Sequence, residues 1–302
     1  MKKLFVNGFN SDIRGDMPKQ ILEEMSRVGG VVQLPEGRMR YEVEGPEDGE
    51  VIVLIHGLAG HMHIWDKNFH ELAKNGFRVI RYDIFGRGFS ERIEQVHNSD
   101  LFVGQLKGLA DHLYLKKPFH LMGLSMGGAV SIRFTSAYPE LVKSLVLVDA
   151  FGIPTPNDPL LLITRPKYLG EALMGSVGGP FIKAATARGV KEPKKHTGFR
   201  KWFTAPMSKV RSKRALLSSL RNFMVEDHLP HIDKVESLPI KKLIVWGEHD
   251  KVLPLNYGKQ LHSKIPSAKM EVFENSGHIP HYEEPERFNE LVSGFVNEQM
   301  ST

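Results

Sequence analysis

Cysteine is absent from this chain of 302 residues, which excludes disulfide bonds and thiol chemistry. No stretch approaches the roughly 20 consecutive apolar residues of a membrane span, and the chain has no internal repeat or low-complexity segment. Residues 1–6 begin like a secretion signal, but the apolar run stops at Asn7-Gly8, far short of the apolar core that a signal needs. We therefore expect an intracellular protein, located in the cytoplasm.

Net charge is small over most of the chain and concentrated in one segment. Segment 183–221 contains twelve Lys and Arg residues against one acid, Glu192, so it carries +11, and the remainder carries about −6 of the formal net charge of +5. Such a segment is either a solvated face, or it docks on an anionic membrane surface or steers an anionic substrate. No nucleic-acid-binding module is recognisable, so we expect no nucleic-acid partner. The oligomeric state stays open.

Strand-like and helix-like runs alternate along the chain, and several strands are continuous apolar runs. Such runs are typical of parallel strands that are covered on both faces, so the pattern predicts an α/β fold with a mostly parallel central sheet. The hydrophobic content of 41% is ordinary for a globular protein. Strands are expected near 31–34, 39–44, 51–55, 78–83, 118–124, 143–149, 241–247 and 269–274, and core helices near 65–75, 101–115, 126–137, 256–264 and 285–298.

Ser125 stands in the most informative stretch, Gly123-Leu124-Ser125-Met126-Gly127. An apolar strand run precedes this Gly-x-Ser-x-Gly motif and a helix-like run follows it, as in a nucleophile elbow. Glycine fits two residues before and after the serine because a Cβ there would collide with neighbouring backbone. The turn lifts the hydroxyl out of the sheet, so we predict that Ser125 is a nucleophile.

A serine nucleophile needs a histidine to accept its proton and a carboxylate to hold the histidine's tautomer. In elbow enzymes these partners follow in the order serine, acid, histidine. The strand run 242–247 leads into Asp250, and the run 270–274 leads into Gly277-His278. We predict Asp250 as the orienting acid and His278 as the general base.

Neighbouring residues offer alternatives for both partners. His249 and His281 lie close to the favoured residues in the sequence, and Glu248 lies beside Asp250. Asp149, at the end of the run 144–149, would supply the acid in a variant arrangement. The order along the chain and the placement at strand ends favour His278, and they favour Asp250 over Asp149.

The apolar run 51–55 breaks into His56-Gly57-Leu58. A loop in this place offers a second N–H group to an oxyanion hole, beside the N–H of the residue after the nucleophile. We assign the two donors to the backbone of Leu58 and Met126. The His56 imidazole is expected to pack and hydrogen-bond under the loop.

These motifs together resemble the α/β-hydrolase superfamily, in the broad group that holds serine esterases, lipases and carbon–carbon bond hydrolases. The resemblance covers about residues 31–150 and 236–298. It rests on His56-Gly57, on Tyr82-Asp83-Ile84-Phe85-Gly86-Arg87-Gly88-Phe89-Ser90, on Gly123 to Gly128, on Trp246 to Pro254, on Gly277-His278-Ile279-Pro280 and on Glu284-Pro285-Glu286-Arg287-Phe288.

The resemblance implies a hydrolase core in residues 31–151 and 236–302, with an N-terminal extension, 1–30, and an inserted helical cap, 152–235. Haloalkane dehalogenases and epoxide hydrolases of this fold have an aspartate nucleophile, and prolyl aminopeptidases tend to have Trp where this chain has Met126. Carbon–carbon bond hydrolases usually have Trp where this chain has Ile279, which disfavours that group.

The segment 152–235 has helix-like runs at 160–174, 181–187 and 216–224. A helical lid over the strand ends would narrow a site and exclude water. Apolar residues that could line it include Leu161, Leu162, Trp202, Phe203, Met207 and Phe223, although most of them suit the cap's own small core better. Candidate substrate contacts are His56, Gly57, Val252, Ile279 and Trp202.

We therefore expect a serine hydrolase that cleaves a small hydrophobic carboxylic ester through an acyl-enzyme. No cofactor or metal is expected, because no cluster of His, Asp and Glu has metal-ligand spacing. Cleavage of a carbon–carbon bond beside a ketone by the same triad is an alternative, and so is a non-catalytic binding protein, because the fold alone does not decide between them.

Overall fold

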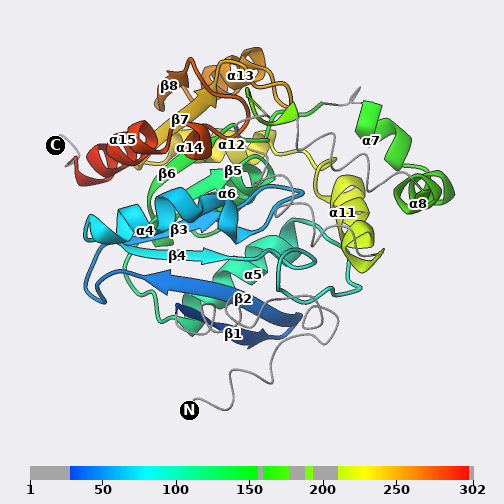
Figure 1. Ribbon diagram of the computed structural model, residues 1–302, viewed down its shortest axis with the longest axis horizontal. Coiled ribbons are helices and arrows are strands. Elements are labelled where there is room, and N and C mark those ends of the chain that lie inside the picture. Colours follow the sequence, from blue (N-terminus) through cyan, green and yellow to red (C-terminus); the bar gives the residue numbers. More distant parts are fainter. Residues whose placement is uncertain (1–27, 156–158, 177–187, 193–209, 299–302) are drawn as a thin grey trace.

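The computed structural model describes residues 28–155, 159–176, 188–192 and 210–298 (Figure 1). An eight-stranded sheet runs in the order β1-β2-β4-β3-β5-β6-β7-β8, in which β1, β2 and β4 pair antiparallel and all other neighbours pair parallel. This is the expected α/β-hydrolase sheet. Its strands are β1 Gly29–Leu34, β2 Gly37–Glu44, β3 Val51–Ile55, β4 Arg78–Tyr82, β5 Phe119–Leu124, β6 Val142–Val148, β7 Lys241–Gly247 and β8 Lys269–Phe273.

Helices cover both faces of this sheet, as the continuous apolar strands predict. Successive residues of a strand point to opposite faces. In β3, Val53 and Ile55 join the core under α5 (Ser99–His112) and α6 (Met126–Ala137), whereas Ile52 and Leu54 join the core under α4 (Asp66–Lys74) and α15 (Pro285–Asn297). The remaining helices of these layers are η1 Met62–Trp65, η2 Pro139–Leu141, α12 Leu229–Ser237, α13 Leu255–Lys264 and α14 Pro280–Glu283.

The segment 152–235 differs from expectation where its helices begin and end. The run expected as one helix over 160–174 forms two, α7 Pro159–Thr164 and α8 Lys167–Ser176. Pro166 separates them, because proline lacks the N–H that a continuing helix needs. The run at 216–224 is the second half of α11, Val210–Asn222, and the run at 181–187 lies outside the described residues.

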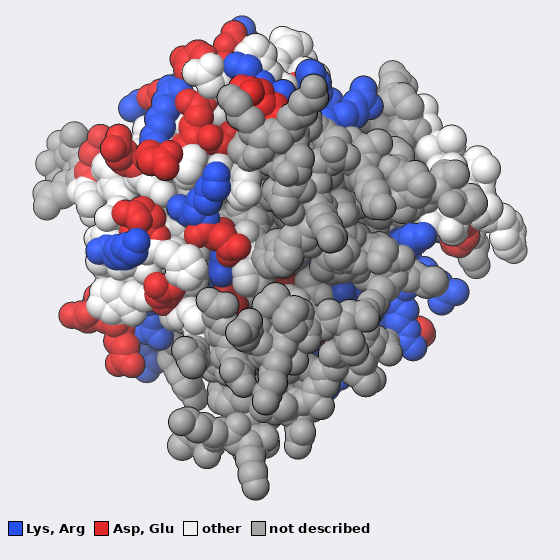
Figure 2. Space-filling model, in the orientation of Figure 1, with Lys and Arg blue, Asp and Glu red and all other residues white. Residues whose placement is uncertain are grey.

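A small apolar core joins α7, α8 and α11, and Leu58 packs against its edge. These three helices lie to one side of the sheet in Figure 1. Figure 2 shows mostly uncharged side chains at the tip where α7 and α8 lie, and mixed charges over the face near α4 and α15. Within the described ranges, no helix combines the length and apolarity that crossing a bilayer requires.

The sheet places the predicted site. β3, β5, β6, β7 and β8 are parallel neighbours or linked through them, so their carboxyl ends meet at one edge. The loops after these ends carry His56, Ser125, Asp149, Asp250 and His278.

Candidate active site

Ser125 occupies a strained turn between β5 and α6. Its φ of +54° and ψ of −120° are unusual for a residue with a side chain. The Ser125 N–H donates to the Val148 carbonyl at 2.9 Å, and the Ser125 carbonyl accepts from the Phe151 N–H at 2.9 Å. A Cβ on Gly123 would lie only 2.3 Å from the carbonyl oxygen of Gly127. The turn therefore requires glycine, and it leaves Ser125 partly exposed at the N-terminus of α6.

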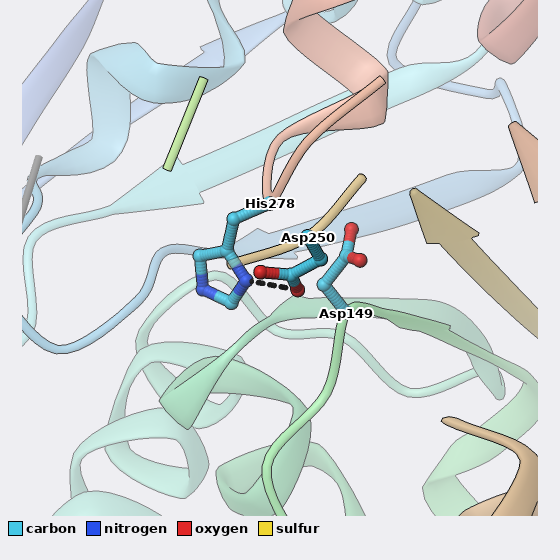
Figure 3. A group of neighbouring side chains, drawn as sticks. All are labelled: Asp149, Asp250 and His278. Carbon is cyan, nitrogen blue, oxygen red and sulfur yellow. Dashed lines mark hydrogen bonds and ion pairs between the residues drawn. The ribbon is translucent and has the colours of Figure 1, made fainter. Parts of the chain in front are cut away.

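Asp250 and His278 come together from the loops after β7 and β8. The Nδ1 of His278 lies 2.7 Å from Oδ2 of Asp250 (Figure 3). The other oxygen of Asp250 accepts the N–H groups of Val252 and Leu253, at 2.7 and 2.9 Å. Backbone donors of this kind favour the ionised carboxylate. An anionic Asp250 fixes the Nδ1–H tautomer of His278, so Nε2 is left to accept a proton.

Asp149 places a second carboxyl group in this cluster. One ligand atom from each of Asp149, Asp250 and His278 lies within 4.8 Å of the others. Asp149 is buried, and its Oδ1 accepts the Gly247 N–H at 2.9 Å. Burial, and then the charge of Asp250, raise the pKa of Asp149 well above its ordinary value. Burial and the neighbouring carboxylate therefore both disfavour the charged form of Asp149.

The other candidates have different surroundings. Glu248 and His249 are exposed, although they directly precede Asp250. His281 is buried, with its ring 4.1 Å from the Trp65 ring, and burial lowers its pKa to about 3. His281 is thus a neutral side chain of the core, whereas His278 is the histidine that meets a carboxylate.

The backbone N–H groups of Leu58 and Met126 make no hydrogen bond within the described residues. Beneath them, the Nδ1–H of His56 donates to the Gly57 carbonyl at 2.7 Å, and Nε2 of His56 accepts the Ile84 N–H at 3.0 Å. Burial lowers the pKa of His56 to about 3, so the ring is neutral and fits this donor–acceptor pair. His56 holds the peptide that carries the Leu58 N–H, as expected of a ring packed under the loop.

The predicted nucleophile lies close to this loop. A Cβ on Gly57 would lie 3.1 Å from Cβ and 3.6 Å from Oγ of Ser125. The Ser125 hydroxyl makes no hydrogen bond within the described residues, to His278 or to any other group. Hydrogen bonds between catalytic groups are often long before substrate binds and tighten in the complex.

The remaining predicted substrate contacts are scattered. Val252 is 43% exposed beside Asp250, and Ile279 is buried in the core under α15. Trp202 lies outside the described residues. As for metals, Asp149, Asp250 and His278 form the one group of potential ligands found in the described ranges, and His278 Nδ1 and both Asp250 oxygens are already engaged in hydrogen bonds.

Two contacts to segment 152–235 were not found from the sequence. The His278 N–H donates to the Gly189 carbonyl at 2.7 Å. Glu283 accepts the N–H groups of Gly277 and Lys191, each at 2.8 Å. Segment 188–192 therefore binds directly to the loop that carries His278, and no periodicity in the sequence indicates such a contact.

Sequence comparison identifies relatives along most of the chain. A family model described as alpha/beta hydrolase fold matches residues 50–285. The protein YisY of Bacillus subtilis, named as an AB hydrolase superfamily protein, is 27% identical over 272 residues, which cover 84% of this chain and 94% of YisY. A 2-hydroxy-6-oxononadienedioate/2-hydroxy-6-oxononatrienedioate hydrolase of Escherichia coli is 29% identical over 270 residues, covering 82% of this chain and 87% of that protein.

Solved structures share the fold. A bromoperoxidase from Bacillus anthracis superposes with a TM-score of 0.78 at 22% identity, covering 89% of this chain and all of the bromoperoxidase chain. At this identity the likeness concerns the fold alone.

Proposed function

The chain belongs to the alpha/beta hydrolase fold family, and from that premise we propose that it is a serine hydrolase that cleaves a carboxylic ester of a hydrophobic acyl group. The observation that carries the proposal is the His278–Asp250 hydrogen bond of 2.7 Å, at the same sheet edge as the strained Ser125 turn. An ionised Asp250 makes His278 a base at Nε2, and a strained, partly exposed serine is the residue that such a base would activate.

In the proposed reaction the Ser125 oxygen attacks the ester carbonyl and transfers its proton to His278. The N–H groups of Leu58 and Met126 stabilise the negative oxygen of the tetrahedral intermediate. The intermediate collapses, His278 returns the proton to the leaving alkoxide, and an acyl-enzyme forms. Water, deprotonated by His278, then releases the carboxylic acid and restores Ser125.

The preference for a hydrophobic acyl group is inferred from the neighbourhood of Leu58. The apolar core of α7, α8 and α11 reaches Leu58 and Ala59, beside the N–H that we assign to the oxyanion. We propose that segment 152–235 acts as a helical cap here, so that an acyl chain enters between apolar surfaces.

Cleavage of a carbon–carbon bond beside a ketone is the second candidate. The Escherichia coli relative named as a dienedioate hydrolase favours it. Ile279, where such hydrolases usually carry Trp, makes ester cleavage the first choice.

A fluorophosphonate probe and a substrate panel test the proposal. The probe should label the protein once, at Ser125, and Ser125→Ala should abolish labelling while the protein stays folded. The control is Ser131→Ala, six residues further along the chain in α6, whose hydroxyl donates to the Gly127 carbonyl; it should label normally.

The panel of p-nitrophenyl esters should show turnover that rises with acyl length. Turnover of a dienoic ketone without hydrolysis of any ester would instead establish the carbon–carbon reaction. Labelling that survives Ser125→Ala would place the nucleophile elsewhere.

A further inference from the structure

Arg87 is a buried cation in the loop between β4 and α5, and no carboxylate of the described residues pairs with it. Burial, and then the charge of Arg92, lower the pKa of Arg87 to about 9, so its guanidinium is still charged at neutral pH. An unpaired buried charge is costly unless its donors are satisfied. The cost of burying the Arg87 guanidinium therefore depends on which acceptors its N–H groups reach.

The guanidinium donates to acceptors from three parts of the molecule. Nε donates to the Leu58 carbonyl at 3.1 Å, and Nη2 donates to the Ser219 hydroxyl of α11 at 2.7 Å. Nη1 donates to the Phe85 carbonyl at 3.0 Å and to Nδ1 of His97 at 3.1 Å. Arg87 thus joins three segments: the loop after β3 that carries Leu58, its own loop between β4 and α5, and helix α11 of segment 152–235.

Leu58 is fixed on both sides by these contacts. The carbonyl before its N–H belongs to Gly57 and is held by His56, and its own carbonyl is held by Arg87. Because a peptide group is planar, the Gly57 carbonyl held by His56 sets the direction of the Leu58 N–H, and the Leu58 carbonyl held by Arg87 restrains the next peptide against it.

Helix α11 also contacts the same loop through close packing and a further hydrogen bond. A Cβ on Gly86 would lie 2.3 Å from Cβ of Ala215 in α11, and the His97 N–H donates to the Ser218 hydroxyl at 3.0 Å. The Ser219 hydroxyl in turn donates to the Ala215 carbonyl at 3.1 Å, so its lone pair is directed by the helix. The position of α11 therefore determines whether the Ser219 hydroxyl is within reach of Arg87 Nη2.

We propose that Arg87 is a positioning residue that links the position of α11 to the oxyanion hole, by holding the Leu58 carbonyl and so restraining the neighbouring peptide that carries the Leu58 N–H. The inference rests on the proposed function, because it requires an oxyanion at this place. When α11 moves away, Arg87 loses the Ser219 hydroxyl and the hold on Leu58 loosens. Its positive charge beside the hole adds to the stabilisation of the developing negative oxygen.

The test compares Arg87→Met, Arg87→Lys and Ser219→Ala with Arg92→Met as the matched control. Arg92 is also buried and donates to the Ser212 hydroxyl of α11, and it donates as well to the carbonyls of Gly88 and Ser90, in its own loop. The readouts are kcat and KM on the best ester, and the affinities for a trifluoromethyl ketone, which forms an oxyanion adduct, and for the product alcohol, which does not. Thermal unfolding is measured for each variant.

Removal of one oxyanion donor costs about 10²- to 10³-fold in kcat in known cases, and a misdirected donor should cost about 10- to 100-fold. We expect Arg87→Met to lower kcat and ketone affinity by that factor with KM and alcohol affinity nearly unchanged. Arg87→Lys should recover part of the loss, and Ser219→Ala should show a smaller loss of the same kind. Arg92→Met should alter thermal stability without separating ketone from alcohol affinity.

Equal losses of ketone and alcohol affinity in Arg87→Met, or the same separation in Arg92→Met, would show that Arg87 only supports the fold. Normal kinetics in Ser219→Ala would remove the link to α11. A wild-type protein that neither reacts with a fluorophosphonate nor binds the ketone would contradict the proposed function, and this is seen before any variant is compared.

Discussion

At the scale of single residues, two carboxyl groups stand beside His278, and they differ in their hydrogen bonds and burial. Asp250 has one oxygen at His278 Nδ1 and the other at two backbone N–H groups, which favour the anion. For Asp149, burial and then the charge of Asp250 raise the pKa well above its ordinary value. The sequence placed both acids at strand ends, and this difference in environment assigns them different roles.

Substitution of each acid by its amide separates these roles. Asp250→Asn removes the charge that holds the His278 tautomer, and we expect kcat to fall about 10⁴-fold, as in serine proteases. Asp149→Asn keeps an oxygen that accepts the Gly247 N–H and leaves the Asp250–His278 hydrogen bond in place, so kcat should fall less than about tenfold. Steady-state kinetics on one ester, with circular dichroism of both variants, measure this. The reverse ranking would make Asp149 the orienting acid.

The sequence predicts Ser125, Asp250 and His278 because each stands in a local motif at a strand end. It does not predict the bonds of Arg87, because its acceptors Leu58 and Ser219 lie 29 and 132 residues away. A local pattern reports which backbone turn forms, whereas a buried polar contact depends on which distant segments meet.

At the scale of elements, the sheet strands agree with their predicted spans to within two residues, because several are continuous apolar runs and β2 alternates apolar with charged residues. Helix α12 was not predicted. Only Ile232 and Val235 of this helix are buried, and Pro230 occupies its first turn, so its apolar periodicity is too short to be recognised. The amphipathic character of α11 was found only over its second half, because Arg211, Lys213 and Arg214 mask the pattern in the first.

The outer side of α7 and α8 carries exposed apolar side chains beside a basic helix. Tyr168 is 85% exposed and Leu169 is 51% exposed, with Leu162 and Ile163 exposed in the preceding helix. Arg211 and Arg214 of α11 are exposed as well. Exposed apolar residues together with cations suit an anionic lipid surface, and we predict that α7, α8 and α11 dock there.

The measurement is sedimentation with vesicles of anionic or neutral phospholipid, at low and at raised salt. Binding should require anionic lipid and weaken as salt screens it. Leu162→Asn with Leu169→Asn should weaken binding at all salt concentrations, and Arg211→Gln with Arg214→Gln should remove the salt dependence. The control is Val96→Asn with Tyr114→Asn, two exposed apolar residues outside α7 and α8. Equal sedimentation with both lipids at every salt concentration would leave the basic segment as a solvated face.

At the scale of the whole molecule, buried neutral histidines make the fold sensitive to acid. Burial lowers the pKa of His56, His97 and His281 to about 3, and that of His228 to about 4. In the unfolded chain histidine titrates near 6.5. Between these pH values the unfolded state binds protons that the folded state does not bind. The free energy of unfolding therefore decreases as the pH falls from about 6.5 towards 4.

Buried acids act in the opposite direction. Burial raises the pKa of Asp83, Asp149 and Glu283, so these groups bind protons in the folded state before they do in the unfolded state. Protonation of these groups therefore increases the free energy of unfolding as the pH falls. The pH dependence of the unfolding free energy is therefore the sum of both kinds of group. The contribution of a single histidine has to be measured by substituting that histidine.

His281 is suited to this experiment because its ring packs on Trp65 and Phe288, so that Phe can replace it without loss of ring contact. With folded and unfolded pKa values of about 3 and 6.5, His281 should cost the folded state about 2 kcal/mol more at pH 5 than at pH 7. His281→Phe should therefore reduce the difference in unfolding free energy between these pH values by that amount, measured by urea titration. The same exchange at exposed His249 should leave the difference unchanged, because that ring meets water in both states. An unchanged difference in His281→Phe would mean that His281 takes up its proton within the folded protein, through a local opening of the α4–α14 contact that unfolds nothing else.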